Sequence, residues 1–180
     1  MSASRGRVVW ITGLSGAGKT TLARSLIPLL PPPVLWFDGD GIRKALASVA
    51  SGYAREDRLR LAYASSNLCK LAAEQGLTVA CSIMALFHEI QSWNRDNLPG
   101  YFEIFLDVPE EIRLARDYKK VYQQRPGRGE PTPVVGREIV PEVPLTPDLH
   151  LTEYHLGPDQ QAELAMKALS KVWLTEVASK

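Results

Sequence analysis

One octapeptide near the start of the chain constrains the fold more than any other feature. Residues 13–20 have the sequence G-L-S-G-A-G-K-T, which fits the Walker A phosphate-loop pattern G-x-x-x-x-G-K-[ST]. The apolar run 7–12 precedes the loop and a helical pattern follows it, which is the strand-then-helix setting that the motif requires. Glycines let the backbone curl so that successive N–H groups face one anion, and the following helix directs its positive dipole end there. The segment therefore predicts a site for the phosphates of a nucleoside triphosphate.

Each part of the loop has an expected role toward Mg-ATP. Lys19 places a point charge at the β- and γ-phosphates and acts as a catalytic residue, and the Thr20 hydroxyl ligates Mg²⁺. The alternative is a glycine-rich turn without a ligand, which the flanking strand and helix disfavour. The loop residues assigned to ATP binding are Gly13, Leu14, Ser15, Gly16, Ala17, Gly18, Lys19, Thr20 and Thr21.

Length and composition predict an ordinary globular protein with one domain, residues 1–180. Hydrophobic residues make up 45% of the 180 residues and the net charge is +1, so we expect neither a nucleic-acid partner nor a membrane span. The polar first residues lack the apolar core of a signal peptide, and Cys69 and Cys81 lie in apolar patterns typical of buried free thiols. We therefore expect a cytoplasmic protein. The oligomeric state stays open, with a homodimer as one option.

Apolar runs alternate with helical patterns along most of the chain, which predicts an α/β fold. The arrangement expected is a P-loop NTPase-type three-layer αβα sandwich around a parallel five-stranded sheet, with ligands outside the carboxyl ends of the strands. The expected strands are 7–12, 34–37, 77–83, 101–107 and 148–151, and the expected helices are 20–30, 43–49, 56–75, 87–97, 109–116 and 159–177.

The segment 117–147 differs in character from the rest of the chain. It is rich in proline, lysine and arginine and has little hydrophobic periodicity. A loop of this length inside a compact domain is usually functional, so we interpret it as a lid that closes over the phosphates and excludes water. Lys119 is the lid cation assigned to substrate binding, and a disordered insertion is the alternative.

Two carboxylates follow the second expected strand. We expect that strand to lie next to the phosphate-loop strand, and alternate residues of an extended segment point the same way, so Asp38 and Asp40 could both face one cleft. Phosphoryl transfer needs a group that takes the proton of the acceptor, and a carboxylate of this pair could serve as that base or serve the metal. The alternative is a solvated D-G-D turn.

Candidate acceptor-binding residues follow these carboxylates. Arg43 lies three residues after Asp40, and the forked guanidinium suits phosphate or sulfate better than a lysine would. Arg58 lies in the first turn of the next helix. Tyr53 and Phe87 are among the aromatic residues that could stack on a base.

The combined motifs resemble the adenylylsulfate kinase family over roughly residues 8–151. The resemblance rests on the phosphate loop, on D-G-D-G-I-R at 38–43, on G-Y at 52–53 with D-R at 57–58, on F-E-I-F-L-D-V-P at 102–109, on A-R-D-Y-K at 115–119 and on the closing segment 144–151. It implies a P-loop kinase that uses Mg-ATP to phosphorylate the ribose 3′-hydroxyl of adenylyl sulfate.

The resemblance also implies roles for individual residues. Asp38 is the implied base, Arg43 and Arg58 hold the acidic groups of the acceptor, and Tyr53 stacks on its base. Arg116 lies against the adenine of ATP, and Lys119 belongs to the lid. A small nucleotide is then the expected partner.

Several acceptor-side positions depart from the family pattern. An expected asparagine is Leu61, the S-P-Y-R stretch is A-L-F-H at 85–88, and the lid F-T-G is V-V-G at 134–136. Other stretches, such as N-L-C-K at 67–70 and Y-F-E at 101–103, resemble a sister group, the cytidine diphosphoramidate kinases of capsule modification. Both acceptors therefore stay open. A GTPase-like switch protein fits less well, because no N-K-x-D guanine motif occurs.

Overall fold

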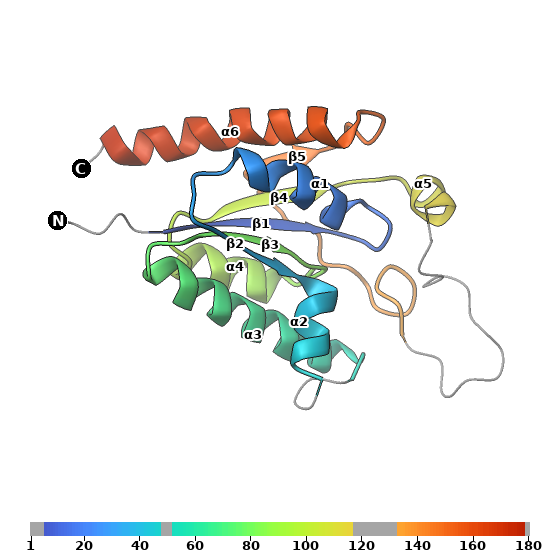
Figure 1. The fold of residues 1–180 in the computed structure, drawn as a ribbon. Coiled ribbons are helices and arrows are strands. Elements are labelled where there is room, and N and C mark those ends of the chain that lie inside the picture. Colours follow the sequence, from blue (N-terminus) through green and yellow to red (C-terminus); the bar gives the residue numbers. More distant parts are fainter. Residues whose placement is uncertain (1–5, 48–51, 117–132, 179–180) are drawn as a thin grey trace.

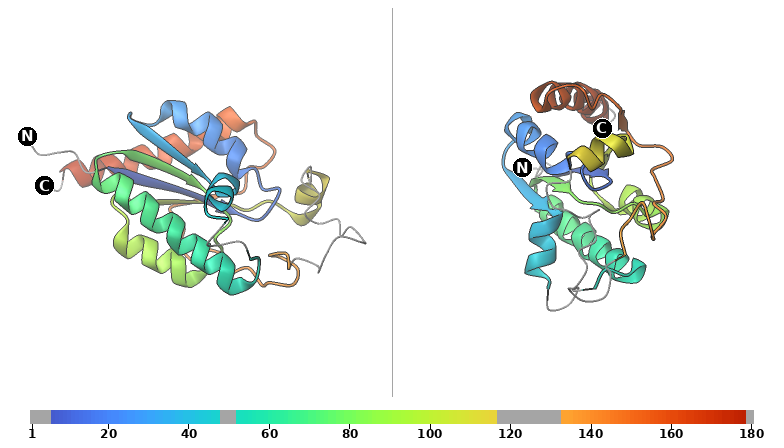
Figure 2. Two further views of the ribbon diagram at one scale, coloured as in Figure 1. Left: turned by 60° about the horizontal axis from the view of Figure 1, so that its bottom comes forward. Right: turned by 90° about the vertical axis from the view of Figure 1, so that its right-hand side faces the viewer.

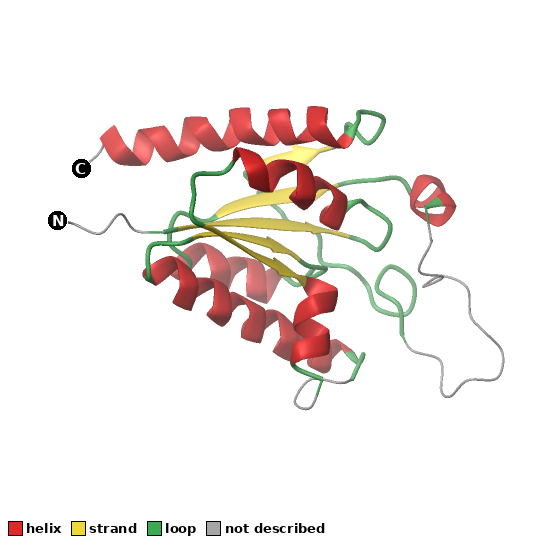
Figure 3. Cartoon of the chain, in the orientation of Figure 1, coloured by secondary structure: helices red, strands yellow, loops and turns green. Residues whose placement is uncertain are grey.

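The central sheet and its helices form three layers. The computed structural model describes residues 6–47, 52–116 and 133–178. In this part of the chain a parallel sheet has the order β2-β3-β1-β4-β5, and helices cover both of its faces (Figures 1 and 3). The strands are β1 (Arg7–Gly13), β2 (Val34–Asp38), β3 (Thr78–Ser82), β4 (Phe102–Leu106) and β5 (Leu149–Leu151). The predicted αβα sandwich with a five-stranded parallel sheet is confirmed.

The helices divide between the two faces of the sheet. One layer contains α1 and α6, and α3 and α4 lie side by side in the other (Figure 2, left). The short helices α2 and α5 lie toward the carboxyl ends of the strands (Figure 1). The helices are α1 (Lys19–Leu26), α2 (Gly39–Ala45), α3 (Arg55–Glu74), α4 (His88–Asn97), α5 (Glu110–Ala115) and α6 (Pro158–Ala178), and a 3₁₀ turn, Ile27–Leu29, follows α1.

Burial on both faces explains why the strands are nearly continuous apolar runs. In β1, Val9 and Ile11 pack into the core under α1 and α6, whereas Val8 and Trp10 pack into the core over α3 and α4. Successive side chains of a strand point to opposite faces, so a strand covered on both sides needs apolar residues at every position. This packing makes β1 a rigid base for the loop that follows it.

Several local signals end elements where expected. Gly76 follows α3 with φ 88°, a left-handed conformation that suits the residue after a helix end. The helix expected over residues 43–49 begins earlier and ends earlier, since α2 spans Gly39–Ala45 and residues 48–51 are outside the described part of the chain. Asp38 is the reason for the early start, because its side chain accepts a hydrogen bond from Asp40 N and caps the helix.

The expected position of β2 in the sheet was wrong. It does not pair with β1, because β3 lies between them and pairs with both. All five residues of β3 are buried, as expected for a strand between two neighbours, whereas those of β2 are only partly buried. β2 is therefore an edge strand, with Asp38 at its carboxyl end.

A carboxylate is buried in β4, on the other side of β1 from β2 and β3. Glu103 in β4 is 2% exposed, and burial raises its pKa to about 7. Arg95 Nη2 of α4 lies 3.4 Å from Glu103 Oε2, and Asp148 Oδ2 accepts a hydrogen bond of 2.8 Å from Glu103 N. The Arg95 guanidinium therefore compensates only part of the cost of burying this carboxyl group.

Both cysteines lie in the core over α3 and α4. Cys69 and Cys81 are buried free thiols, as expected. Among the described residues, no helix combines the length and the apolar character needed to cross a bilayer.

Candidate functional site

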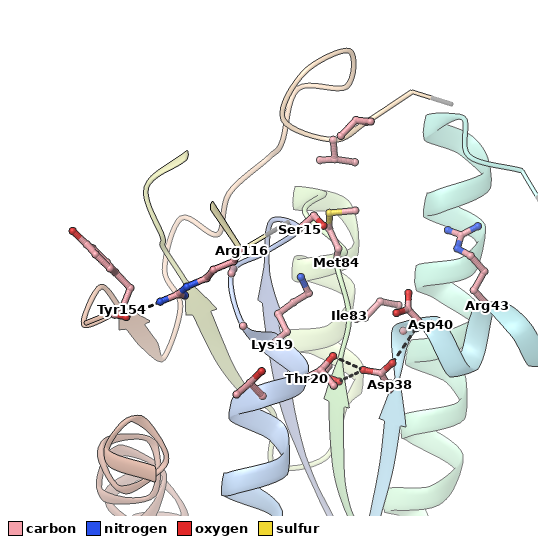
Figure 4. A pocket seen from close by; sticks show the side chains of 18 of the residues that line it. Ser15, Lys19, Thr20, Asp38, Asp40, Arg43, Ile83, Met84, Arg116 and Tyr154 are labelled. Carbon is pink, nitrogen blue, oxygen red and sulfur yellow. Dashed lines mark hydrogen bonds between the residues drawn. The ribbon is translucent and has the colours of Figure 1, made fainter. Parts of the chain in front are cut away.

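A cavity of about 640 Å³ opens at the carboxyl ends of the strands. The phosphate loop, the carboxyl ends of β2 and β3, and the segment after β5 form its walls (Figure 4). This is the edge where ligands bind in parallel sheets, and Figure 2 (right) faces it.

The phosphate loop has the backbone geometry that its glycines predict. Gly16 has φ 80° and Gly18 has φ 98°, both in the left-handed region. A Cβ atom at Gly16 would come within 2.7 Å of Arg113 O, so the close packing of the loop against α5 also requires glycine there. Gly18 precedes α1, whose first turn contains no acidic side chain. The loop therefore presents a positive helix end to an anion.

Lys19 lies over this loop and lines the cavity. Its Nζ donates hydrogen bonds to Gly13 O at 2.9 Å and to Leu14 O at 2.8 Å. Gly13 and Leu14 do not line the cavity themselves, and they act here through carbonyl groups that hold the ammonium. The remaining loop residues assigned to ATP, Ser15 to Thr21, all line it.

Asp38 lines the cavity at the end of β2, next to Thr20, the last residue of the phosphate loop. The Thr20 hydroxyl donates a hydrogen bond of 2.8 Å to Asp38 Oδ1, and the Ser82 hydroxyl donates one of 3.0 Å to the same oxygen (Figure 4). Although β3 separates β2 from β1, α1 crosses above β3 and brings Thr20 to the end of β2. The structure thus brings the predicted base and the predicted metal ligand together.

Asp40 lines the cavity beside Asp38, but for a different reason from the one expected. The two residues do not alternate along an extended segment, because Asp40 is the second residue of α2. Its backbone N–H lies 3.3 Å from Asp38 Oδ2. The N-terminus of α2, and not strand alternation, places both carboxylates at one wall.

Two arginines and one tyrosine form the other half of the cavity. The Arg43 and Arg58 guanidinium carbons lie 4.5 Å and 5.4 Å from the centre of the Tyr53 ring. Arg58 Nη2 also donates to Pro133 O at 2.8 Å, and Arg43 Nη1 donates to Gly52 O at 2.9 Å. Burial and the nearby Arg43 charge lower the pKa of Arg58. Two close cations at a partly exposed aromatic ring favour an anionic ligand with a planar group.

Arg116 lies at the far end of the cavity, near the segment that follows β5. Its Nη2 donates a hydrogen bond of 3.0 Å to Tyr154 O (Figure 4). Tyr154, Leu156 and Gln161 line this end, and the sequence analysis did not assign them. Tyr154 and Leu156 lie in the loop between β5 and α6, and Gln161 lies in the first turn of α6. The position of this segment after the last strand, at the edge where parallel sheets bind ligands, is the signal that could have identified these residues.

One predicted substrate-binding residue does not line the cavity, and another lies outside the described part of the chain. Phe87 is 1% exposed and packs in the core over α3 and α4, with the Arg55 guanidinium 5.1 Å from its ring. The prediction failed because apolar burial, and not stacking on a ligand, fixes this ring. Lys119 lies outside the described residues, so its role stays a prediction.

Glu142 holds part of the predicted lid segment, 117–147, against α3 and α4. Its carboxylate accepts hydrogen bonds of 2.7 Å from Arg55 Nη2 and from His88 N, and its carbonyl accepts one of 2.8 Å from Gln91 Nε2. The Arg55 hydrogen bond is the main reason that the pKa of Glu142 is lowered. Val134 and Val135 of the same segment line the cavity.

Sequence comparisons show which known proteins this chain resembles. The family described as Adenylylsulphate kinase matches residues 5–152. An adenylyl-sulfate kinase of Chloroflexus aurantiacus is 39% identical over 149 residues, which cover 81% of this chain and 79% of that protein. A cytidine diphosphoramidate kinase of Campylobacter jejuni is 29% identical over 166 residues, 91% of this chain and 96% of that protein.

Solved structures agree with these sequence relatives. The Mycobacterium tuberculosis APS kinase in complex with AMPPNP and APS superposes with a TM-score of 0.80 at 30% identity, covering 93% of this chain and 99% of that one. The likeness therefore extends over most of this chain.

Proposed function

The chain belongs to the adenylylsulphate kinase family, and we propose that it transfers the γ-phosphoryl group of ATP to the ribose 3′-hydroxyl of adenylyl sulfate. Its enzyme class follows from the family, which consists of phosphotransferases with an alcohol group as acceptor. One observation carries the proposal for the site: the Asp38 carboxylate lies 2.8 Å from the Thr20 hydroxyl, in one cavity with the phosphate loop and Arg43. A base thus faces the place where a γ-phosphate would end.

The donor half of the cavity suits ATP. The loop N–H groups and the N-terminus of α1 would surround the phosphates, and Lys19 would neutralise charge that develops on the transferred group. Arg116, held by Tyr154 O, offers a planar face for the adenine. These groups contribute position and charge, which are the main requirements of phosphoryl transfer.

The acceptor half suits a nucleotide with acidic groups. Arg43 and Arg58 would bind phosphate or sulfate oxygens, and Tyr53 would stack on the base. The ribose hydroxyl would then lie between this half and the phosphate loop, where Asp38 can accept its proton as the oxygen attacks the γ-phosphorus. Asp40 lines the same wall and would contact the acceptor sugar.

Magnesium fits the oxygen groups at the centre of the cavity. Mg²⁺ prefers oxygen ligands, keeps several waters and usually takes only one or two protein ligands beside the substrate phosphates. The Thr20 hydroxyl, together with phosphate oxygens and waters, would match that pattern, and the described residues contain no cluster of three His, Cys, Asp or Glu side chains that would suggest another kind of metal site. When bound, the ion would neutralise phosphate charge.

A second acceptor, cytidine diphosphoramidate, is supported by the apolar part of the acceptor wall. Leu61, Ile83 and Met84 line the cavity, and Leu61 replaces an asparagine that we expect in kinases of adenylyl sulfate. A wall with fewer hydrogen-bonding groups discriminates weakly between bases. The chemistry of the transfer would be the same.

An acceptor panel tests the proposal directly. The purified protein with Mg-ATP should release ADP with adenylyl sulfate and not with its 3′-deoxy analogue, which lacks the attacking hydroxyl. ADP release only with cytidine diphosphoramidate would assign the second acceptor instead. Equal ADP release with every acceptor and without any would contradict a kinase function, and a preference for GTP without an acceptor would indicate a switch protein.

A further inference from the structure

A chain of hydrogen bonds reaches Asp38 from behind the cavity. Trp36 Nε1 lies 3.1 Å from Ser82 Oγ, and Ser82 Oγ lies 3.0 Å from Asp38 Oδ1. The pairing of β2 with β3 explains the alignment, since Asp38 is opposite Ser82 in the register and Trp36 is two residues earlier in the same strand. Trp36 and Asp38 therefore lie on one face of β2, on either side of the serine hydroxyl.

The chemistry of the three groups fixes the direction of both hydrogen bonds. An indole N–H can only donate, and an ionised carboxylate can only accept. Ser82 Oγ must therefore accept from Trp36 and direct its own proton at Asp38. Without Trp36 the hydroxyl could rotate to other acceptors, because a serine O–H has no fixed direction of its own.

These hydrogen bonds give the two carboxylate oxygens of Asp38 different partners. Oδ1 accepts from the hydroxyls of Thr20 and Ser82, whereas Oδ2 has one longer contact of 3.3 Å with Asp40 N. The carboxylate is thus held through Oδ1, and Oδ2 is the oxygen better placed to accept a further proton. Ser82 is 2% exposed, so water does not compete strongly for its hydroxyl.

We propose that Trp36 and Ser82 are positioning residues for phosphoryl transfer, which orient the Asp38 carboxylate so that Oδ2 receives the proton of the acceptor. The inference rests on the proposed function for the reaction that it assists. Ser82 matters most when the Thr20 hydroxyl binds magnesium, because Ser82 is then the side-chain donor that keeps Oδ1 in place. Neither residue contacts the reacting atoms; both act through Asp38.

The hydrogen-bond chain is testable without any activity. A ¹⁵N–¹H spectrum of the labelled protein contains the indole signals of its tryptophans, and the variant Trp36→Phe identifies the signal of Trp36. Loss of the hydrogen bond in Ser82→Ala should move that signal upfield, while the indole signals of Trp93 and Trp173 keep their positions. An unmoved Trp36 signal would overturn the proposed chain.

Kinetics test whether the hydrogen bonds from Trp36 to Ser82 and from Ser82 to Asp38 assist the reaction. Ser82→Ala should lower kcat about tenfold, a cost typical of a misplaced catalytic group, with KM for ATP and acceptor within about twofold of wild type. Trp36→Phe should lower kcat less, and it should cost nothing further in the Ser82→Ala background, because Trp36 acts only through Ser82. In the Asp38→Asn background, Ser82→Ala should also have no effect on residual turnover.

Controls separate positioning from damage to the fold. Trp93→Phe, a substitution of the same kind in α4, should leave kcat unchanged, and thermal unfolding shows whether each variant is folded. An unchanged kcat in folded Ser82→Ala, or independent and additive losses from Ser82→Ala and Trp36→Phe, would overturn the positioning role. A wild-type protein that phosphorylates none of the acceptors would contradict the proposed function and with it the role in transfer, while the indole signal would still decide whether the chain exists.

Discussion

The Thr20 hydroxyl donates a hydrogen bond of 2.8 Å to Asp38 Oδ1, although the strands that lead to the two residues do not pair with each other. Thr20 is the second residue of α1, which follows β1, and Asp38 ends β2, with β3 between the two strands. The contact joins two walls of one cavity: one wall is the phosphate loop, and the other carries Asp38 and the acceptor residues. The first two predictions concern these two sides.

Replacement of the base should affect chemistry more than binding. Asp38→Asn keeps the shape of the side chain but removes its ability to accept a proton, so we expect kcat to fall by about 100- to 10,000-fold. Affinity for an ATP analogue, measured by calorimetry, should change much less. Asp96→Asn, an exposed residue of α4, is the control, and equal kcat in Asp38→Asn and wild type would remove Asp38 from the base role.

Loss of the loop cation should abolish most turnover. Lys19→Ala removes the charge nearest the transferred phosphoryl group, so kcat should fall by about 100- to 1000-fold, as for other groups that stabilise charge in a transition state. Steady-state ADP release measures the effect, with exposed Lys167→Ala in α6 as the matched control. Turnover near the wild-type rate would rule out the proposed donor site.

Removal of an acceptor arginine should raise one KM selectively. Arg58→Ala deletes a partly buried guanidinium that would bind an anionic group, so KM for the acceptor should rise on the order of 10- to 100-fold. KM for ATP should stay within about twofold. Arg60→Ala, two residues later in α3 and exposed, should change neither value. A parallel rise in both KM values would mean that Arg58 supports the whole cavity and not the acceptor alone.

An alanine in the phosphate loop should distort it. Gly16→Ala adds a Cβ at φ 80° and within 2.7 Å of Arg113 O, so we expect a loss of about 1–3 kcal/mol in the free energy of unfolding and weaker ATP binding. Gly41→Ala is the matched control, since a Cβ there meets no atom within 4 Å. Urea unfolding of both variants measures the difference, and equal stability would contradict the packing of the loop against α5.

The buried Glu103 should make stability depend on pH. Its pKa is about 7 in the folded protein and near the ordinary 4.5 in the unfolded chain, so the folded state holds the proton more tightly. Stability should therefore fall as pH rises from about 4.5 to about 7, by at most about 3 kcal/mol. Urea unfolding at pH 5 and pH 8 should show this decrease in wild type relative to Glu103→Gln, which cannot ionise.

A control distinguishes this effect from the general titration of the surface. Glu74→Gln, an exposed carboxylate at the end of α3, should keep the wild-type dependence on pH. If Glu103→Gln and wild type lose stability in parallel between pH 5 and pH 8, the ion pair with Arg95 must compensate the burial of Glu103 fully, contrary to its raised pKa.

Features that depend on neighbouring residues could be predicted from the sequence. The phosphate loop, the strand of β1 and the helix end at Gly76 follow from local backbone preferences and from apolar periodicity. The placement of Asp38 at a strand end was also readable, because polar residues after a buried run lie at the edge of the sheet. The chemistry of individual residues in these segments needed no knowledge of distant contacts.

Features that depend on the order of strands and on packing could not be read in this way. The sequence does not state which strand lies next to β1, and the hydrogen bonds among Trp36, Ser82 and Asp38 exist only because β3 occupies that place. Phe87 has the composition of a stacking residue, but the core over α3 and α4 takes its ring. Local patterns thus determined the elements and the donor loop, whereas long-range packing free energy decided which side chains surround the cavity.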